Sequence, residues 1–151
     1  MPRRIRLTLM PDAISVTAEL LEEAAPATIA RVLEQLPIEG RAVHGMYSGP
    51  EVFVRADAVG PCPPENQVHR ALPGDVCYWW NAGGEKQMAR EPAGEILYIY
   101  DRGAAITGPE GQPTWANLFA RVTGDLAEFA AASRRVRLEG GRFLRIERDD
   151  G

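Results

Sequence analysis

One short amphipathic segment constrains what this chain can fold into more than any other. Its apolar side chains recur at intervals of three and four residues, which places them on one face of a helix: Ile29, Val32, Leu33 and Leu36. Pro26 suits the first turn of such a helix, because a proline has no N–H that needs a partner there. Pro37 then ends it. The sequence therefore predicts a helix over residues 26–36, around which the flanking strands pack.

Alternation of apolar and polar residues predicts strands on both sides of this helix. Residues 4–9 and 14–20 form an antiparallel hairpin that turns at Pro11 and Asp12. Residues 56–74 hold too many prolines and glycines for a regular element, so a long ordered loop is expected there. The strands expected after the helix are residues 40–47, 51–55, 76–80, 94–100, 117–122, 135–138 and 141–146.

A second helix is predicted near the carboxyl end. Asp125 and Glu128 have the residue types of a capping box, in which the first accepts a hydrogen bond from the first turn and the second reaches back. This helix should run to about Arg134. The predicted order is strand, strand, helix, several strands, helix, strand. Open sheet edges are a liability around so small a core, so a closed barrel capped by the two helices is the expected fold.

Composition limits the classes of protein to which the chain can belong. With 151 residues, 45% hydrophobic and 25% charged, residues 1–151 are expected to form a single domain. A net charge of −4 argues against nucleic acid as a partner. No stretch approaches the roughly 20 apolar residues of a membrane span, and the amino terminus lacks the pattern of a signal peptide. We therefore expect a cytoplasmic protein with no membrane partner.

Several short motifs resemble a known fold family. The segment of residues 19–28, in which a strand end runs into a Pro-x-Thr helix start, resembles the corresponding segment of cyclophilins. The chain is more similar still to bacterial proteins of unknown function with a cyclophilin-like fold. That resemblance covers about the first hundred residues and rests on Leu36-Pro37, Gly40-Arg-Ala-Val-His44, Ser48-Gly49, Pro63-Pro-Glu-Asn66 and Pro73-Gly-Asp-Val-Cys-Tyr78.

The resemblance implies a mainly β fold with two helices, closed into a cyclophilin-like barrel, more firmly than it implies an activity. Prolyl isomerases of the cyclophilin family carry a Phe-His-Arg motif whose arginine assists twisting of the substrate amide. Here the corresponding residues are 42–46, and no arginine follows His44. The later Gln-Gly-Gly-Asp segment of those enzymes is absent as well. Both departures argue against prolyl isomerase activity.

His44 and Glu65 are the candidate catalytic residues. An imidazole on a strand can act as a general base or acid near neutral pH, and the adjacent Gly45 lets a ligand approach the backbone. The alternative is a histidine whose hydrogen bonds are satisfied within the fold. Pro63-Pro64 stiffens the backbone before Glu65, so its carboxylate can pair with His44 at a barrel mouth. The alternative for Glu65 is an ordinary carboxylate of a surface loop.

The candidate ligand-binding residues are Tyr47, Ser48, Asn66, Tyr78, Trp80 and Trp115. Asn66 can donate and accept hydrogen bonds, and Trp115 stands in a polar loop from which it can cover a site. Alternation places Trp79 on the opposite face of its strand from Tyr78 and Trp80, so at most one set lines a cavity. Aromatic residues on strands more often fill a core, and Ser48 suits a turn.

No metal or other cofactor is expected. His44 and His69 do not have the close spacing of a strong metal site, and no glycine-rich phosphate loop stands between a strand and a helix. Cys62 and Cys77 have neither metal-binding nor redox spacing and are expected to be free thiols.

Three functions therefore stay open, with the question of catalysis undecided. The preferred one is binding of a small polar metabolite in a barrel-mouth pocket, with its hydrolysis or isomerisation as an extension. The second is a prolyl isomerase or peptide-binding module, which needs an apolar groove and an arginine such as Arg55 or Arg121. The third is a structural subunit of a homo-oligomer, assembled through strand edges and aromatic residues.

Overall fold

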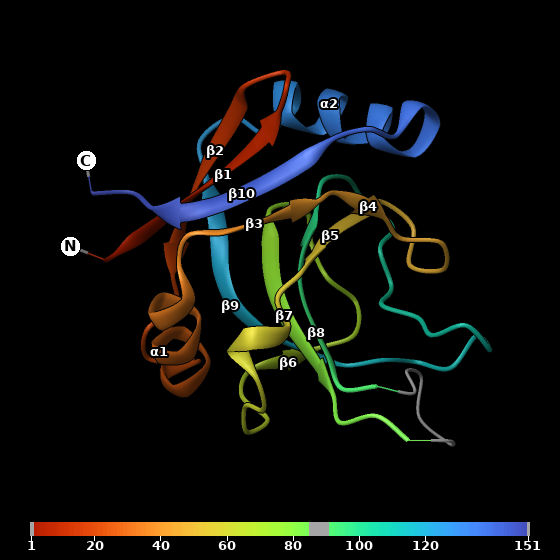
Figure 1. The fold of residues 1–151 in the computed structure, drawn as a ribbon. Coiled ribbons are helices and arrows are strands. Elements are labelled where there is room, and N and C mark those ends of the chain that lie inside the picture. The colour runs from red at the N-terminus through yellow and green to blue at the C-terminus, as the bar shows by residue number, and fades with distance from the viewer. Residues whose placement is uncertain (1, 85–90, 151) are drawn as a thin grey trace.

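A computed structural model of the chain describes residues 2–84 and 91–150 (Figure 1). The fold is mainly β with two helices, as predicted. The helices are α1 (Pro26–Gln35) and α2 (Ala127–Glu139), with a 3-10 helix at Asp57–Val59. The strands are β1 (Arg4–Met10), β2 (Ile14–Leu20), β3 (Ile38–Arg41), β4 (Val43–His44), β5 (Glu51–Arg55), β6 (Gln67–Val68), β7 (Asp75–Asn81), β8 (Ala93–Ile99), β9 (Ala116–Thr123) and β10 (Phe143–Arg148).

The strands form one antiparallel 10-stranded sheet in the order β3-β10-β1-β2-β9-β7-β8-β5-β4, with β6 paired to β9. Its two edge strands, β3 and β4, follow each other in the chain with Ala42 between them. Ala42 still donates its N–H to the Arg142 carbonyl beside β10 (2.9 Å), whereas Val43 already pairs with Phe53 of β5. One extended segment thus serves both ends of the sheet. Among the described strands the ladder is not closed, so the predicted closed barrel is not confirmed.

The larger core lies on the inner face of this sheet. Ile29, Val32 and Leu33 of α1 pack into it, as the amphipathic pattern predicted, together with Phe129 and Val136 of α2. Figure 1 shows the two helices at opposite ends of the sheet. Other members of this core come from alternate positions of the strands: Ile5, Leu7, Val52, Val54, Val76, Tyr78, Ile96, Tyr98 and Phe119.

A second, smaller core lies on the outer face of β7, β8 and β9. Cys77, Leu97 and Leu118 are register partners there, one residue along from the strand positions that face inward. The long connection between β8 and β9 covers them through Ala104 and Ile106. Because this connection does not cover the whole outer face, it leaves room for a cavity beside β5.

Helix α2 is longer than the sequence pattern suggested. Asp125 accepts a hydrogen bond from the Ala127 N–H at 2.9 Å, close to the predicted start. The predicted strand at residues 135–138 is wrong, because these residues continue the helix to Glu139. Val136 lies on the buried helical face seven residues after Phe129, a spacing of two turns. Four residues are too few to distinguish that spacing from strand alternation.

Candidate functional site

Two adjoining cavities, of about 260 and 70 Å³, lie on the outer face of the sheet. Strands β5, β7 and β8 form their floor, and residues 43–48 and the connection after β8 form their walls. The residues that line both cavities are Ser48, Glu51, Trp79, Glu95 and Thr107. This place is the outer face beside the second core, not the mouth of a barrel.

Strand alternation and register bring these side chains together. Glu51, Phe53 and Arg55 alternate along β5 and share its outer face. Glu95 of β8 is the register partner of Arg55 on one side and of Trp79 on the other. Acidic, aromatic and basic side chains from three neighbouring strands therefore meet on one surface.

Glu51 is the most unusual of these residues. Its relative exposure is 6%, yet its carboxyl forms no hydrogen bond or ion pair with any residue that the structure describes. The carboxyl lies against Gly45, where an added Cβ would come within 2.3 Å of Oε1. Burial, together with the negative charge of Glu95, raises the pKa of Glu51 from 4.5 to about 7. At neutral pH this group is both a proton donor and an acceptor.

Glu95 is a second carboxyl with a raised pKa in the same cavity. Burial raises its pKa from 4.5 to about 7; the Arg55 charge opposes this rise and the Asp57 charge adds to it. Arg55 directs its guanidinium to Asp57 in a two-pronged ion pair, with Nε–Oδ1 and Nη2–Oδ2 distances of 3.0 and 2.8 Å. Asp57 therefore holds the basic side chain nearest to Glu95.

His44 lies at the edge of the larger cavity with both ring nitrogens bonded. Nδ1 is 2.8 Å from the Gly45 carbonyl, which can only accept, so Nδ1 carries the hydrogen. In the neutral ring Nε2 then accepts from the Tyr100 hydroxyl at 2.7 Å. Tyr47 and Ser48 also line this cavity, and the Ser48 hydroxyl accepts a hydrogen bond from the Thr107 N–H (3.0 Å).

The structure does not bring Glu65 to His44. The Glu65 carboxylate accepts hydrogen bonds from the N–H groups of Ala27 and Thr28 (3.0 and 2.9 Å) and from the Thr28 hydroxyl (2.8 Å). Burial alone would raise the pKa of Glu65, but these hydrogen bonds hold it below the ordinary value. Asn66 donates to the Leu118 carbonyl at 3.0 Å. Both residues therefore anchor their loop, one to α1 and the other to β9.

The predicted aromatic residues are divided among three places. Tyr78 is buried in the inner core and donates its hydroxyl to the Gly60 carbonyl (2.7 Å), and Trp80 packs against the same core. Trp115 is exposed and contacts the ring of His69 at a centroid distance of 5.8 Å. Trp79 lines the cavity instead. The alternation along β7 was predicted correctly, but the set assigned to the ligand was the inward one.

Glu51, Glu95 and Trp79 line the cavity but are not among the residues that the sequence analysis assigned to a ligand. For Glu51 and Glu95 the available signal was a carboxylate at an otherwise apolar strand position, in Glu51-Val-Phe-Val and in Glu95-Ile-Leu. The arginines considered for a peptide-binding function are both engaged: Arg55 with Asp57, and Arg121 with Asp75 at 3.1 Å.

Within residues 2–84 and 91–150, no three His, Cys, Asp or Glu side chains are grouped so that they could hold a metal ion. Cys62 and Cys77 are free thiols, as predicted. Neither described helix has the length and apolar character needed to cross a membrane.

Two solved structures share this fold at low sequence identity. McbB, solved in complex with tryptophan, is 18% identical with a TM-score of 0.69; the match covers 97% of this chain and 45% of McbB. This chain thus spans less than half the length of McbB. The hypothetical protein AF2241 from Archaeoglobus fulgidus, solved in solution, is 19% identical with a TM-score of 0.57, and the match covers 98% of this chain and 95% of that one.

No functionally curated protein matches the sequence. The predicted resemblance to cyclophilins and to bacterial proteins does not appear in these comparisons, whereas membership of a family of unknown function does. A family model described as "Protein of unknown function (DUF3830)" matches residues 7–147, and the chain belongs to this family.

Proposed function

We propose that this protein binds a small metabolite that joins an aromatic ring to an amino group, in the cavity between Glu51, Glu95 and Trp79. The observation that carries the proposal is the pair of largely buried carboxyls in one cavity with an aromatic wall. An ammonium group in this cavity would be attracted by both carboxyls in their ionised forms and could form an ion pair with either. The ring of the same ligand would stack on Trp79, with Phe53 and Tyr47 beside it.

The raised pKa values give this binding a defined pH dependence. A cation between the carboxyls favours their charged forms and lowers both pKa values, so binding at neutral pH releases protons. Affinity for an ammonium ligand should therefore rise between about pH 6 and pH 8, as the empty site becomes ionised.

Two further observations support this class of ligand. The larger cavity, of about 260 Å³, is near the lower end of the range for small-molecule sites and suits a single ring with a short side chain. McbB, which shares the fold, was solved with tryptophan, a molecule of this kind. We expect the protein to act in the cytoplasm, as a single domain.

Calorimetric titration at pH 8 with tryptamine, tryptophan and indole-3-propionate tests the proposal. Tryptamine carries the ring and the amine, tryptophan adds a carboxylate, and indole-3-propionate replaces the amine by an acid. We expect tryptamine to bind and indole-3-propionate to fail, because its carboxylate would meet two like charges.

Variants distinguish binding of tryptamine in this cavity from nonspecific attraction of a cation to an acidic protein. Glu51→Gln and Glu95→Gln should each weaken tryptamine binding by about tenfold or more. Glu128→Gln removes an exposed carboxylate of α2 and should leave binding unchanged. Equal binding by Glu51→Gln and the unchanged protein, or equal binding of indole-3-propionate, would exclude this site.

Proton transfer to the bound metabolite is the catalytic extension of this proposal. Glu51 faces the cavity with a pKa near 7, the range in which a general acid or base works best. His44 stands at the cavity edge as a second candidate. Hydrolysis or isomerisation of an amine-bearing substrate should then follow a pH profile that shifts in Glu51→Asp, and an unshifted profile would remove Glu51 from the chemistry.

A further inference from the structure

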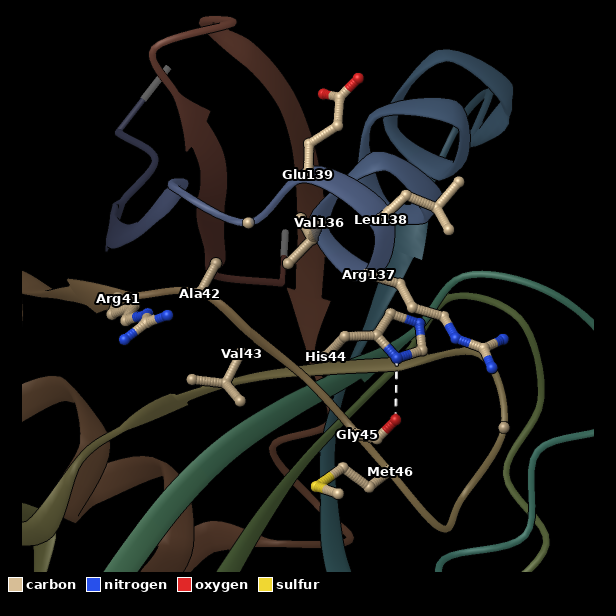
Figure 2. Close-up of a pocket in the computed structure, with 12 residues that line it drawn as sticks. Arg41, Ala42, Val43, His44, Gly45, Met46, Val136, Arg137, Leu138 and Glu139 are labelled. Carbon is tan, nitrogen blue, oxygen red and sulfur yellow. Dashed lines mark hydrogen bonds between the residues drawn. The ribbon is translucent and has the colours of Figure 1, made fainter.

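A larger groove, of about 620 Å³, runs between the segment of residues 41–46, which includes β4, and the last turn of α2 (Figure 2). Residues 41–46 form one wall and residues 136–140 form the other. It joins a cavity of about 400 Å³ that adds Tyr100, Arg102 and the ion pair of Arg134 with Asp101. We call this combined space the β4–α2 groove. A strand edge facing a helix end across an elongated space is a shape that accepts an extended chain.

The β4 edge in this groove has unpaired backbone groups. The Gly45 N–H donates to the Glu51 carbonyl at 2.8 Å, which is the ladder bond at that position, while the Glu51 N–H turns to the Gly49 carbonyl. Bonded and non-bonded positions alternate along an antiparallel ladder, so His44, the position before Gly45 and opposite Val52, directs its backbone N–H and C=O away from β5. Among the described strands β4 pairs with β5 alone, and an added strand would satisfy these groups.

The groove is positively charged in an acidic protein. Arg41, Arg102 and Arg137 line it and form no ion pair with any residue that the structure describes. Figure 2 shows Arg41 at one end of the segment of residues 41–46 and Arg137 beside His44. The chain as a whole carries a net charge of −4. Because the surrounding surface repels anions, these free guanidinium groups favour an acidic partner at this groove in particular.

Apolar side chains complete the groove. Met46 and Leu138 border it with exposed fractions of 82% and 84%, the highest among the large hydrophobic residues that the structure describes. Exposed apolar side chains grouped beside a binding surface are typical of protein contacts. An extended chain in which acidic and apolar residues alternate could contact both the guanidinium groups and the apolar side chains of the groove.

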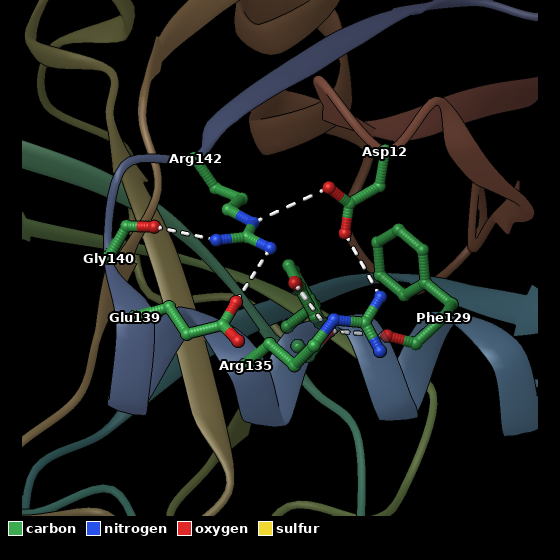
Figure 3. Close-up of polar contacts among 8 residues, drawn as sticks. Asp12, Phe129, Arg135, Glu139, Gly140 and Arg142 are labelled. Carbon is green, nitrogen blue, oxygen red and sulfur yellow. Dashed lines mark hydrogen bonds and ion pairs between the residues drawn. The ribbon is translucent and has the colours of Figure 1, made fainter.

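The helical wall is fixed by a network of ion pairs (Figure 3). Arg142 contacts Asp12 at 3.5 Å and Glu139 at 2.8 Å and donates to the Gly140 carbonyl at 3.0 Å. Arg135 reaches the other oxygen of Asp12 at 3.0 Å. The network ties the end of α2 to the β1–β2 turn. It also occupies Glu139, so this carboxylate does not neutralise the groove.

From these observations we propose that the β4–α2 groove binds an extended acidic segment of a partner protein, which adds to the sheet as a strand beside β4. The proposal does not depend on the metabolite cavity, although residues 43–46 line both the cavity and the groove. Free backbone groups supply hydrogen bonds to the segment, Arg41, Arg102 and Arg137 select its charge, and Met46 and Leu138 contact its apolar side chains.

Fluorescence anisotropy with a pool of labelled hexapeptides tests the proposal. The peptides carry Glu at alternate positions and random apolar residues between them. We expect the acidic pool to bind, a pool with Lys in place of Glu not to bind, and a pool N-methylated at alternate residues to bind about tenfold more weakly, because methylation removes strand hydrogen bonds. Amide NMR signals of His44 and Met46 should shift on binding.

Charge-reversal variants locate the binding. Arg41→Glu and Arg137→Glu should each reduce affinity for the acidic pool by about tenfold or more. Arg70→Glu reverses the charge of an exposed arginine outside the groove and should leave the affinity for the acidic pool unchanged. Failure of the acidic pool, or indifference to N-methylation and to Arg137→Glu, would overturn the proposal. A dimer in solution that Arg137→Glu dissociates would also overturn it, since a second copy would then fill the groove.

Discussion

The Glu65 carboxylate accepts two hydrogen bonds from Thr28, one from its N–H at 2.9 Å and one from its hydroxyl at 2.8 Å. Helix α1 begins at Pro26 after Ala25, whose side chain cannot cap it. A carboxylate from a distant loop therefore takes the place of the capping side chain. The Asn117 amide donates to both the Thr28 hydroxyl and the Pro63 carbonyl, which fixes this loop against the helix start.

Replacement of Glu65 should therefore destabilise the fold. We expect Glu65→Ala to lower the free energy of unfolding by about 1–2 kcal/mol, the usual loss for a helix cap. Glu34→Ala, on the exposed face of the same helix, should change it by less than about 0.5 kcal/mol. Urea denaturation at pH 7 measures both.

The same contact predicts loss of stability in acid. Because the hydrogen bonds hold the folded-state pKa of Glu65 below the ordinary 4.5, its contribution is present above about pH 4.5 and disappears as the pH falls through the folded value. The difference in unfolding free energy between Glu65→Gln and the unchanged protein should shrink below pH 4.5. A constant difference down to pH 3 would show that charge is irrelevant to this cap.

From the raised pKa of Glu51 we expect the opposite dependence of folding stability on pH, in a higher pH range. Its pKa is about 7 in the folded protein and 4.5 ordinarily, so between these values the folded state binds more protons than the unfolded state. Stability should fall as the pH rises from about 4.5 to about 7. Glu51→Gln should flatten this decline, which melting temperatures measured from pH 4.5 to pH 8 would reveal. An unchanged slope would mean that the carboxyl is ionised at no energetic cost.

The local elements of the fold were predictable from the sequence, because their signals are local. The three-and-four spacing of α1 and the alternation of β1 and β2 each arise within about ten residues. The path of the sheet depends on which strands pair at long range. Ala42, where one segment changes partner from β10 to β5, has no sequence signature.

The candidate site was harder to predict for a related reason. Sequence reasoning found His44, Tyr47 and Ser48, which share the segment that forms one wall of the cavity. Glu51 and Glu95 reach the same cavity only through the pairing of β5 with β8, in which Glu51 lies opposite Ile99 and Glu95 opposite Arg55. Glu65 had the composition of a catalytic carboxylate, but its partner at the start of α1 is 37 residues away in the chain.

Gly45 sets the position of the Glu51 carboxyl. A Cβ at this residue would lie 2.3 Å from Oε1, so Gly45→Ala should displace the carboxyl. The loss of stability should stay below about 1 kcal/mol, because the displaced atom ends a flexible side chain. Tryptamine affinity should fall about tenfold, as measured by calorimetry. In a Glu51→Gln background the same substitution should have little further effect on affinity, and additive losses would contradict this coupling.

Trp79 and Trp80 are adjacent on β7 and should respond oppositely to truncation. Trp79 lines the cavity, so Trp79→Ala should weaken tryptamine binding by about tenfold, the equivalent of roughly 1.4 kcal/mol of lost ring contact. Trp80 packs against the inner core, so Trp80→Ala should lower the free energy of unfolding by about 1–3 kcal/mol and leave affinity nearly unchanged. Calorimetric titration and urea denaturation of both variants separate the two effects. If instead Trp80→Ala abolished binding and Trp79→Ala did not, the ligand would lie on the inward face of β7, where the sequence pattern alone had assigned it.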